Sequence, residues 1–235
     1  MKSYKQYCGL ALALDHIGDR WTLLIVRELL TGAKRFSDLQ DGLPGVASNL
    51  LAERLRRMEE DGLLRREELH PPRPATLYEL TDLGAGLQEP IEALARWGGR
   101  WMIRRDPEQA FRPEWLAIAF PALLREAPLP REMTIALQTP EGRTVLTAED
   151  GKLTAAAGPL ADAPGTTGDA ARGGPAPDHP DCALRGEAQL ILGVAAGVVS
   201  WKQAEKAGLE VTGDEESVAR LRSVLGRNAE GEAGD

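Results

Sequence analysis

GVASNLLAERLRRMEEDGLLRR, residues 45–66, is the stretch of sequence that decides the fold. Leu51, Leu55 and Met58 recur at helical spacing and form one apolar stripe. Gly62 follows the last of them and ends the pattern. The other side of the same helix carries small, polar and basic residues, which places them opposite the stripe. The stretch therefore predicts an amphipathic helix that begins near Ser48 and turns a polar, partly basic face outward.

The segments before this helix predict three more helices. Apolar residues recur at helical spacing over 10–17, and WTLLIVRELL at 21–30 is apolar on most sides, so it should be the buried centre of its domain. Asp19 is the expected N-cap of that central helix. RFSDLQDGL at 35–43 predicts a short helix, which the tight turn LPG joins to the amphipathic helix.

The segments after the amphipathic helix predict a hairpin and a closing helix. LLRREEL at 63–69 and TLYEL at 76–80 are short strands separated by the proline-rich HPPRPA. Thr81 is the expected cap of a helix that runs to about Trp101, in which Pro90 marks a kink or a break. A short helix, a turn, an amphipathic helix and a hairpin together make a winged helix-turn-helix.

The charge of the chain is unevenly distributed. The 235 residues have a formal net charge of -8, but residues 1–105 hold 16 Lys and Arg against 15 Asp and Glu. Residues 106–235 hold 12 against 21, so the acidity belongs to the second part of the chain. Such an asymmetry predicts two units with different partners. Because salt screens charges beyond about 8–10 Å, an acidic second unit does not prevent the first from approaching phosphate.

Other features of the composition limit the class of protein. Two cysteines are too few for a disulfide framework and favour a reducing compartment. No apolar run is long enough to span a bilayer, and the first residues lack a signal-peptide pattern. We therefore expect a soluble, cytoplasmic protein without a membrane partner.

Three segments carry a specific resemblance. IGDRWTLLIVRELLTGAKRFSDL, LPGVASNLLAERLRRMEEDGLLRR and YELTDLG resemble the HxlR family of bacterial transcriptional regulators, in the family's order and over most of residues 7–101. The resemblance implies a homodimer whose terminal helices pair and whose two wings sit on a pseudo-palindromic site in double-stranded DNA. The second helix of the pair then enters the major groove, where base edges are distinguishable.

The amphipathic helix supplies most of the candidate DNA contacts. Ser48 and Asn49 occupy its exposed start and can hydrogen-bond to base edges, while Arg56 and Arg57 are expected to touch phosphate. Arg54 matches an arginine of the family motif and bonds either the DNA backbone or a neighbouring helix. The alternative is that the three arginines are an ordinary solvated helix face.

Three residues outside this helix complete the predicted DNA interface. Lys34 and Arg35 precede the first helix of the pair, where phosphate contacts are expected. Arg73 is the charged residue at the wing tip and is expected in the minor groove.

Cys8 is a candidate redox site. It stands where many relatives carry a cysteine, and some relatives sense electrophiles or oxidants through it; a thiol at a helix start can have a lowered pKa. The alternative is a small residue packed in the dimer.

The second part of the chain predicts an α+β domain. Residues 110–226, roughly, predict a helix, a hairpin and a later strand-helix-helix-strand-helix pattern. On this pattern they resemble sterol-carrier-protein type 2-like domains, which hold apolar molecules between a sheet and helices. The residues expected to line such a pocket are Trp115, Phe120, Met133, Leu190, Leu192, Val198 and Trp201. The alternative is a filled core, since a domain of this size must bury such side chains.

These patterns predict an α+β protein with three parts: a winged-helix domain at 1–105, a sterol-carrier-like domain at 106–226 and a disordered tail at 227–235. We find no catalytic set, metal site or cofactor motif, and expect no enzyme activity. The interpretation is a DNA-binding regulator, expected to repress, whose second domain senses a hydrophobic small molecule. The alternatives are constitutive DNA binding with a carrier or dimer-brace domain, or thiol-based sensing through Cys8.

Overall fold

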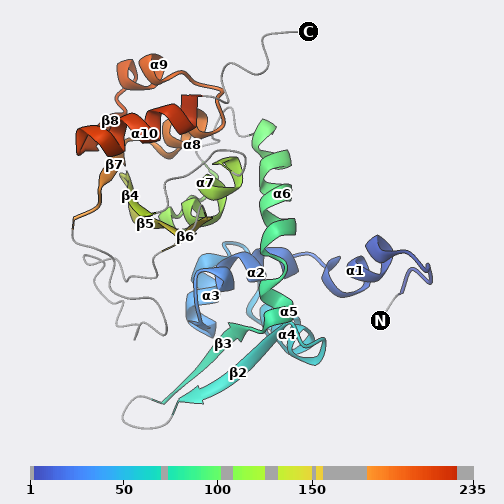
Figure 1. Ribbon diagram of the computed structural model, residues 1–235. Helices are drawn as coiled ribbons and strands as arrows, with labels where there is room; N and C mark the ends of the chain where they lie inside the picture. Colours follow the sequence, from blue (N-terminus) through green and yellow to red (C-terminus); the bar gives the residue numbers. More distant parts are fainter. Residues whose placement is uncertain are drawn as a thin grey trace. The chain divides into compact units, whose positions relative to one another are not determined.

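The computed structural model describes residues 3–69, 74–101, 108–124, 132–149, 152–155 and 179–226 (Figure 1). The chain forms two compact units, Met1–Ile91 and Glu92–Asp235. The division falls earlier in the chain than the predicted boundary at residue 105. Arg73 and the predicted disordered tail at 227–235 lie outside the described residues.

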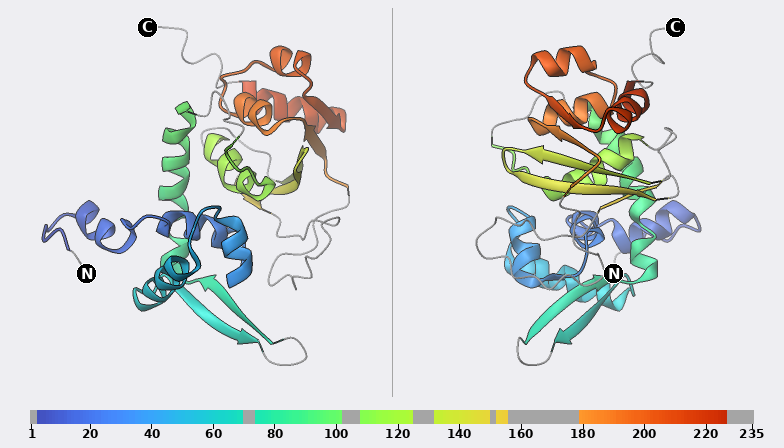
Figure 2. Two further views of the ribbon diagram at one scale, coloured as in Figure 1. Left: turned by 180° about the vertical axis from the view of Figure 1, so that it is seen from behind. Right: turned by 60° about the vertical axis from the view of Figure 1, so that its left-hand side comes forward.

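The first unit contains the predicted helices and hairpin. Its elements are α1 (Gly9–Ile17), α2 (Thr22–Leu30), β1 (Lys34–Arg35), α3 (Phe36–Gly42), α4 (Ser48–Glu60), β2 (Leu64–Leu69), β3 (Ala75–Leu80), α5 (Asp82–Ala85) and the start of α6 (Gln88–Gly98). The strands form an antiparallel sheet in the order β1-β3-β2. In both views of Figure 2, β2 and β3 extend away from the helices as a long hairpin. The mixed α+β winged-helix prediction is confirmed for this unit.

The core of the first unit follows the predicted stripe. Leu51, Leu55 and Met58 on α4 are almost completely buried, as are Ile25 and Val26 on α2. At roughly 1.5–3 kcal/mol for each large side chain buried, this stripe fixes which face of α4 turns inward. The helix then ends as predicted, because Gly62 adopts a φ of 73°, which a glycine reaches without strain.

Two predicted helix boundaries differ from the structure. Asp19 is not the N-cap of α2; Trp21, with a φ of 83°, precedes the helix, and the Asp19 side chain faces α4 instead. Thr81 is a cap, as predicted, and its Oγ1 accepts from the backbone N–H of Gly84 at 3.2 Å. The break in the closing helix, however, lies between Ala85 and Gln88, while Pro90 sits in the first turn of α6, where no intrahelical N–H is needed.

The second unit is a five-stranded sheet with helices packed against it. Its elements include, in chain order, the rest of α6, η1 (Gly99–Trp101), η2 (Pro113–Trp115), α7 (Leu116–Leu124), β4 (Glu132–Thr139), β5 (Gly142–Glu149), β6 (Lys152–Ala155), β7 (Cys182–Arg185), α8 (Ala188–Ala195), α9 (Trp201–Lys206), β8 (Glu210–Gly213) and α10 (Glu215–Gly226). The strand order is β6-β5-β4-β7-β8, with β4 and β7 parallel and the other pairs antiparallel. Buried side chains of α7, α8 and α10 share one core with those of the strands.

In the part of the chain that the structure describes, no helix has the length and apolar character needed to cross a membrane.

Candidate nucleic-acid interface

Helix α4 presents a polar face to solvent. Its first two residues, Ser48 and Asn49, are exposed, as is Arg56 two turns later. Ala47 occupies the N-cap position and offers no side-chain cap, and the first intrahelical bond runs from the Leu51 N–H to the Ala47 carbonyl. The positive end of the helix dipole is therefore directed at whatever approaches the start of α4.

Hydrogen bonds orient both polar side chains at the start of α4. The amide Nε2 of Gln40, on α3, donates to Ser48 Oγ at 2.5 Å. The Asn49 Oδ1 accepts from the backbone N–H of Leu50 at 2.9 Å. Sequence reasoning missed Gln40, although its place across the LPG turn from Ser48 was the available signal. The turn brings α3 close enough to α4 for a side chain of α3 to position the polar start of α4.

Arg56 is the most exposed of the three α4 arginines, with 63% of its side chain accessible. It forms an i,i+4 ion pair with Glu60, on the same exposed face. An exposed pair of this kind contributes only about 0–1 kcal/mol, so it presents little resistance to a competing phosphate. Arg56 is therefore exposed to solvent on α4, and its contact with phosphate stays a prediction.

Arg54 and Arg57 turn in the opposite direction. Asp19 Oδ2, in the turn between α1 and α2, lies 3.1 Å from Arg54 Nη1 and 3.6 Å from Arg57 Nη1. Arg57 Nε also lies 3.9 Å from Asp61 Oδ2, and Arg57 Nη2 donates to the backbone carbonyl of Asp15 at 3.2 Å. Only 15% of the Arg54 side chain and 25% of that of Arg57 are exposed. Both guanidinium groups therefore attach the inner side of α4 to the turn between α1 and α2, and Arg57 also contacts α1 itself. Arg54 was expected to bond the DNA backbone or a neighbouring helix; in the structure its partner Asp19 lies in the turn.

The remaining predicted cations lie on the small sheet. Lys34 and Arg35 form β1, both partly exposed, and Lys34 is paired with Tyr78 on β3. Tyr78 is paired in turn with Arg66 on β2, a residue that sequence reasoning missed. Directly paired residues share one face of a sheet, so Lys34, Tyr78 and Arg66 form a row across it. Arg66 also pairs with Glu68 at 3.5 Å.

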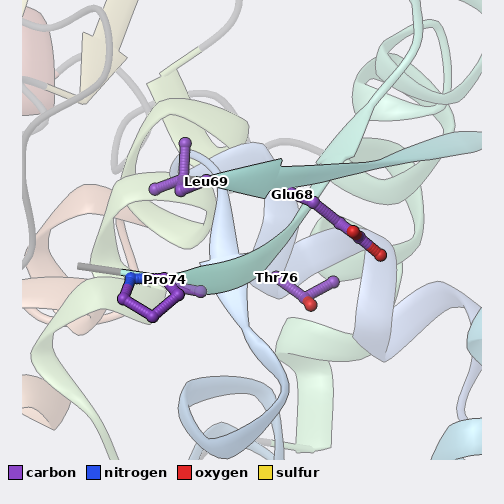
Figure 3. Close-up of a pocket in the computed structure, with 5 residues that line it drawn as sticks. Glu68, Leu69, Pro74 and Thr76 are labelled. Atoms are coloured by element: carbon purple, nitrogen blue, oxygen red, sulfur yellow. The ribbon is translucent and has the colours of Figure 1, made fainter. Parts of the chain in front are cut away.

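A shallow hollow lies at the outer end of the hairpin (Figure 3). It is lined by Glu68, Leu69, Pro74, Ala75 and Thr76. The carboxylate of Glu68 makes this hollow unsuitable for a phosphate group, and we assign it no ligand.

The two cysteines have opposite surroundings. Cys8 is exposed just before α1, where the backbone N–H groups of Ala11 and Leu10 lower the pKa of its thiol. Cys182 is buried in β7, where burial, followed by the nearby acidic side chains, raises the pKa of its thiol to about 12. Of the two, only Cys8 has the exposure and the thiolate character that reactivity needs.

The predicted pocket residues do not share one environment. Phe120, Met133 and Leu192 belong to the packed core of the second unit, as the filled-core alternative expects. Val198 is 69% exposed, away from that core. The partly buried members, which pack on or beside the core, are Trp115, Leu190 and Trp201. Within the described residues, no group of His, Cys, Asp and Glu is arranged to hold a metal ion.

Comparison with known proteins gives consistent matches for the first part of the chain. The family described as HxlR-like helix-turn-helix matches residues 16–106. The HTH-type transcriptional regulator YvaP of Bacillus subtilis (strain 168) is 35% identical over 91 residues, which are 38% of this chain and 83% of YvaP. The HTH-type transcriptional regulator YtfH of Escherichia coli (strain K12) is 37% identical over 94 residues, 40% of this chain and 75% of YtfH. A solved structure, the redox regulator HypR in its reduced form, is 29% identical, with a TM-score of 0.38 over 40% of this chain and 92% of HypR.

Proposed function

Because the chain belongs to the HxlR-like helix-turn-helix family of transcriptional regulators, we propose that it acts as a homodimeric repressor on a pseudo-palindromic operator. The observation that carries this proposal is the orientation of α4, which buries its apolar stripe and exposes Ser48, Asn49 and Arg56. Two copies related by a twofold axis would place two such helices in major grooves one turn apart. A regulator of this kind acts where the chromosome is, in the cytoplasm.

The proposed contacts divide into base readout and backbone positioning. Ser48 and Asn49 read base edges, whereas Lys34, Arg35 and Arg56 bind phosphates. The predicted minor-groove contact of the wing-tip arginine, Arg73, remains part of the proposal.

Arg54 and Arg57 are assigned a different role. Their ion pairs with Asp19 hold α4 against the α1–α2 turn. We therefore leave both out of the proposed phosphate contacts, although sequence reasoning had expected Arg57 among them.

Charge removal at Arg56 tests the DNA-binding proposal. Arg56→Gln should lower operator affinity and reduce the slope of log affinity against log salt by about 0.9 for each phosphate that is no longer neutralised. A symmetric dimer has two such phosphates, one in each half-site. Arg220→Gln is the matched control, because Arg220 is also more than half exposed and also forms an i,i+4 pair, with Glu216. Equal salt slopes for Arg56→Gln and the unmodified protein would contradict the assigned contact.

Exposed apolar side chains support the proposal of a homodimer. Leu10, Leu12 and Leu14 are exposed on α1, and Tyr4 and Tyr7 are exposed just before it. Soluble monomers rarely expose contiguous apolar patches larger than a few hundred Å². We propose that α1 pairs with its copy in a second chain.

A second apolar surface lies on and after α6. Leu94, Trp97 and Trp101 are at least half exposed. The two indole rings lie edge to face, with their centroids 4.6 Å apart. Leu10→Glu and Trp97→Glu should each weaken the dimer in sedimentation experiments. Val198→Glu, at a comparably exposed position outside both surfaces, should not.

We further propose that the second unit is a sterol-carrier-like domain that senses an apolar small molecule. The support is its α+β arrangement, in which buried side chains of α7, α8 and α10 share a core with the sheet. Because Phe120, Met133 and Leu192 are packed in this core, a ligand would have to bind a more open state. Only a ligand with different affinities for the two states can shift their populations and so alter DNA binding.

Deletion of residues 106–235 separates sensing from constitutive binding. If the second unit is only a carrier or a brace, operator affinity of the full chain should not respond to any apolar compound that raises its melting temperature. If it senses a ligand, stabilising compounds should change the affinity of the full chain and leave the truncated chain unaffected.

The alternative sensing mode, through Cys8, is supported by the exposure of that residue and by its lowered pKa. Treatment with a thiol oxidant should then change operator affinity of the unmodified chain. The Cys8→Ser chain should be insensitive to the same treatment.

A further inference from the structure

We infer that the start of α4 presents hydrogen-bond donors to DNA and reads guanine. Gln40 is the positioning residue that makes Ser48 a donor to DNA and not an acceptor. This inference rests on the proposed function, since it concerns which base the DNA-reading helix prefers. Three side chains carry it: Gln40, Ser48 and Asn49.

The polarity of Ser48 is set by its neighbour on α3. A serine hydroxyl has one donor proton and two acceptor lone pairs. Gln40 Nε2 donates to Ser48 Oγ at 2.5 Å and so occupies the acceptor side of the hydroxyl that faces α3. Gln40 does not take the proton of Ser48, so the proton and one lone pair remain for partners outside the protein. Accepting a bond from Gln40 also polarises the hydroxyl and makes it a stronger donor.

The polarity of Asn49 is set by the helix itself. Its Oδ1 faces back to the Leu50 N–H, at 2.9 Å, so the Nδ2 amino group is the outward end of the side chain. In this rotamer Oδ1 is directed at the backbone of α4, so it does not face the same external partner as Nδ2. The bidentate recognition of adenine, which needs both atoms on one edge, is therefore disfavoured. Ser48 and Asn49 are both exposed and are consecutive at the start of α4.

Two adjacent donors select among the four bases. In the major groove guanine shows two acceptors, N7 and O6, and no donor. Adenine and cytosine each present an amino donor, and thymine presents one acceptor beside a methyl group. The positive end of the α4 dipole favours the same acceptor atoms. Guanine is thus the base whose edge matches the start of α4.

Selection of binding sites from a random duplex library, at one stated salt concentration and with the full-length chain, tests the inference. The unmodified protein should enrich a pseudo-palindrome with a fixed guanine in each half-site. Replacing that guanine by 7-deazaguanine removes the N7 acceptor and should weaken binding by roughly 2- to 12-fold per half-site, the range for one neutral hydrogen bond. The alanine variant of the residue that donates to N7, Ser48→Ala or Asn49→Ala, should bind the guanine and 7-deazaguanine duplexes equally. If Ser48 is that donor, Ser48→Thr keeps the hydroxyl and should still bind the 7-deazaguanine duplex more weakly.

Gln40→Glu tests the positioning role. A carboxylate only accepts, so it would draw the Ser48 proton inward and leave a lone pair facing the base. The preference for guanine over cytosine at the fixed position should fall by roughly 2- to 12-fold. Because this is a ratio between two sites, a uniform loss of affinity from the added charge cancels. Gln189→Glu, an exposed glutamine on α8, carries the same charge change and should keep the preference.

The outcomes separate the inference from the function on which it rests. Enrichment of no sequence at all would overturn both. A selected palindrome whose base preferences are unchanged in Gln40→Glu, or whose contacted base is cytosine or adenine, would overturn the inference and leave the operator-binding function intact. Uniform loss of affinity in Ser48→Ala without any change in base preference would assign Ser48 to phosphate and also overturn the inference.

Discussion

Replacing Asp19 with asparagine should loosen α4 while leaving the second unit unchanged. Asp19 Oδ2 lies 3.1 Å from Arg54 Nη1 and 3.6 Å from Arg57 Nη1, so one carboxylate pairs with two guanidinium groups on the same helix. The other carboxylates near these groups are more distant: Glu53 Oε1 lies 3.7 Å from Arg54 Nη1, and Asp61 Oδ2 lies 3.9 Å from Arg57 Nε. The Nε atoms of Arg54 and Arg57 are buried without a hydrogen-bond partner in the described part of the chain. The substitution keeps the size of the side chain and removes its charge, which leaves two neighbouring positive charges largely buried.

The size of the effect follows from the burial of the three groups. Hydrogen bonds to charged groups contribute about 1.5–3 kcal/mol, and breaking a fully buried ion pair costs about 3–5 kcal/mol. Asp19 is 40% exposed, so water screens it and replaces part of the interaction that the substitution removes. Asparagine can also still accept one hydrogen bond. We therefore expect α4 to lose about 1–2 kcal/mol of stability against local opening, which corresponds to roughly a 5- to 30-fold change in the opening equilibrium.

Hydrogen exchange followed by mass spectrometry measures this opening directly. Amides of α4 should exchange roughly 5- to 30-fold faster in Asp19→Asn, while peptides from β4 and β5 keep their rates. Asp15→Asn is the matched control: the Asp15 carboxylate bonds to Ser3 and Tyr4, and its contact to Arg57 uses the backbone carbonyl, which the substitution keeps. Unchanged exchange in α4, or an equal acceleration in α4 and β4, would refute the proposed role of Asp19.

Three further predictions concern single positions. Gly84→Ala should destabilise the first unit by about 1–3 kcal/mol or more in urea unfolding, because its Cβ would lie 1.9 Å from the backbone carbonyl oxygen of Leu63. Thr81→Val, which removes the cap of α5 at nearly constant volume, should cost about 0.5–2 kcal/mol in the same assay. Alkylation of Cys8 should reach half its maximal rate at a pH below that of an ordinary cysteine, because its lowered pKa increases the thiolate fraction near neutral pH. Cys182, with a raised pKa and no exposure, should be alkylated only after unfolding, and mass spectrometry of the two peptides distinguishes them.

The elements of the first unit could be predicted because their signals are local. The stripe Leu51, Leu55 and Met58 repeats along α4 itself, and the Thr81 cap depends on residues a few positions away. The same holds for the hairpin, whose two short strands are separated in the sequence by the proline-rich HPPRPA. Such patterns report the periodicity of one element and need no knowledge of its neighbours.

The direction of single charged side chains could not be predicted in this way. Arg54, Arg56 and Arg57 have the same charge and neighbouring positions, yet Arg56 faces solvent and the other two face Asp19. The difference depends on where the α1–α2 turn lies against α4, which is tertiary information. Asp19 itself was expected to cap α2, a local role that the sequence pattern favours, but its carboxylate pairs with α4 instead.

The pocket prediction shows the corresponding limit for apolar residues. Phe120, Met133 and Leu192 are equally hydrophobic whether they line a cavity or fill a core, and the structure places them in the core. Hydrophobicity predicts that a side chain is removed from water and does not distinguish which neighbour replaces the water. A pocket becomes visible only when several elements fail to close on one another.

The acidity of the chain is compatible with DNA binding because charges are divided between the two sides of α4. Asp19 and Asp61 lie on the inner side of α4, beside Arg54 and Arg57. The exposed part of α4 begins with two neutral polar residues, Ser48 and Asn49. Further along it carries Arg56 and three exposed glutamates, Glu53, Glu59 and Glu60, of which Glu60 pairs with Arg56. In the proposed interface, charge positions the protein on the phosphates, whereas neutral donors at the start of α4 discriminate between bases. The net charge of the whole chain therefore says little about this interface, because specificity depends on the side chains that α3 and the α1–α2 turn leave facing outward.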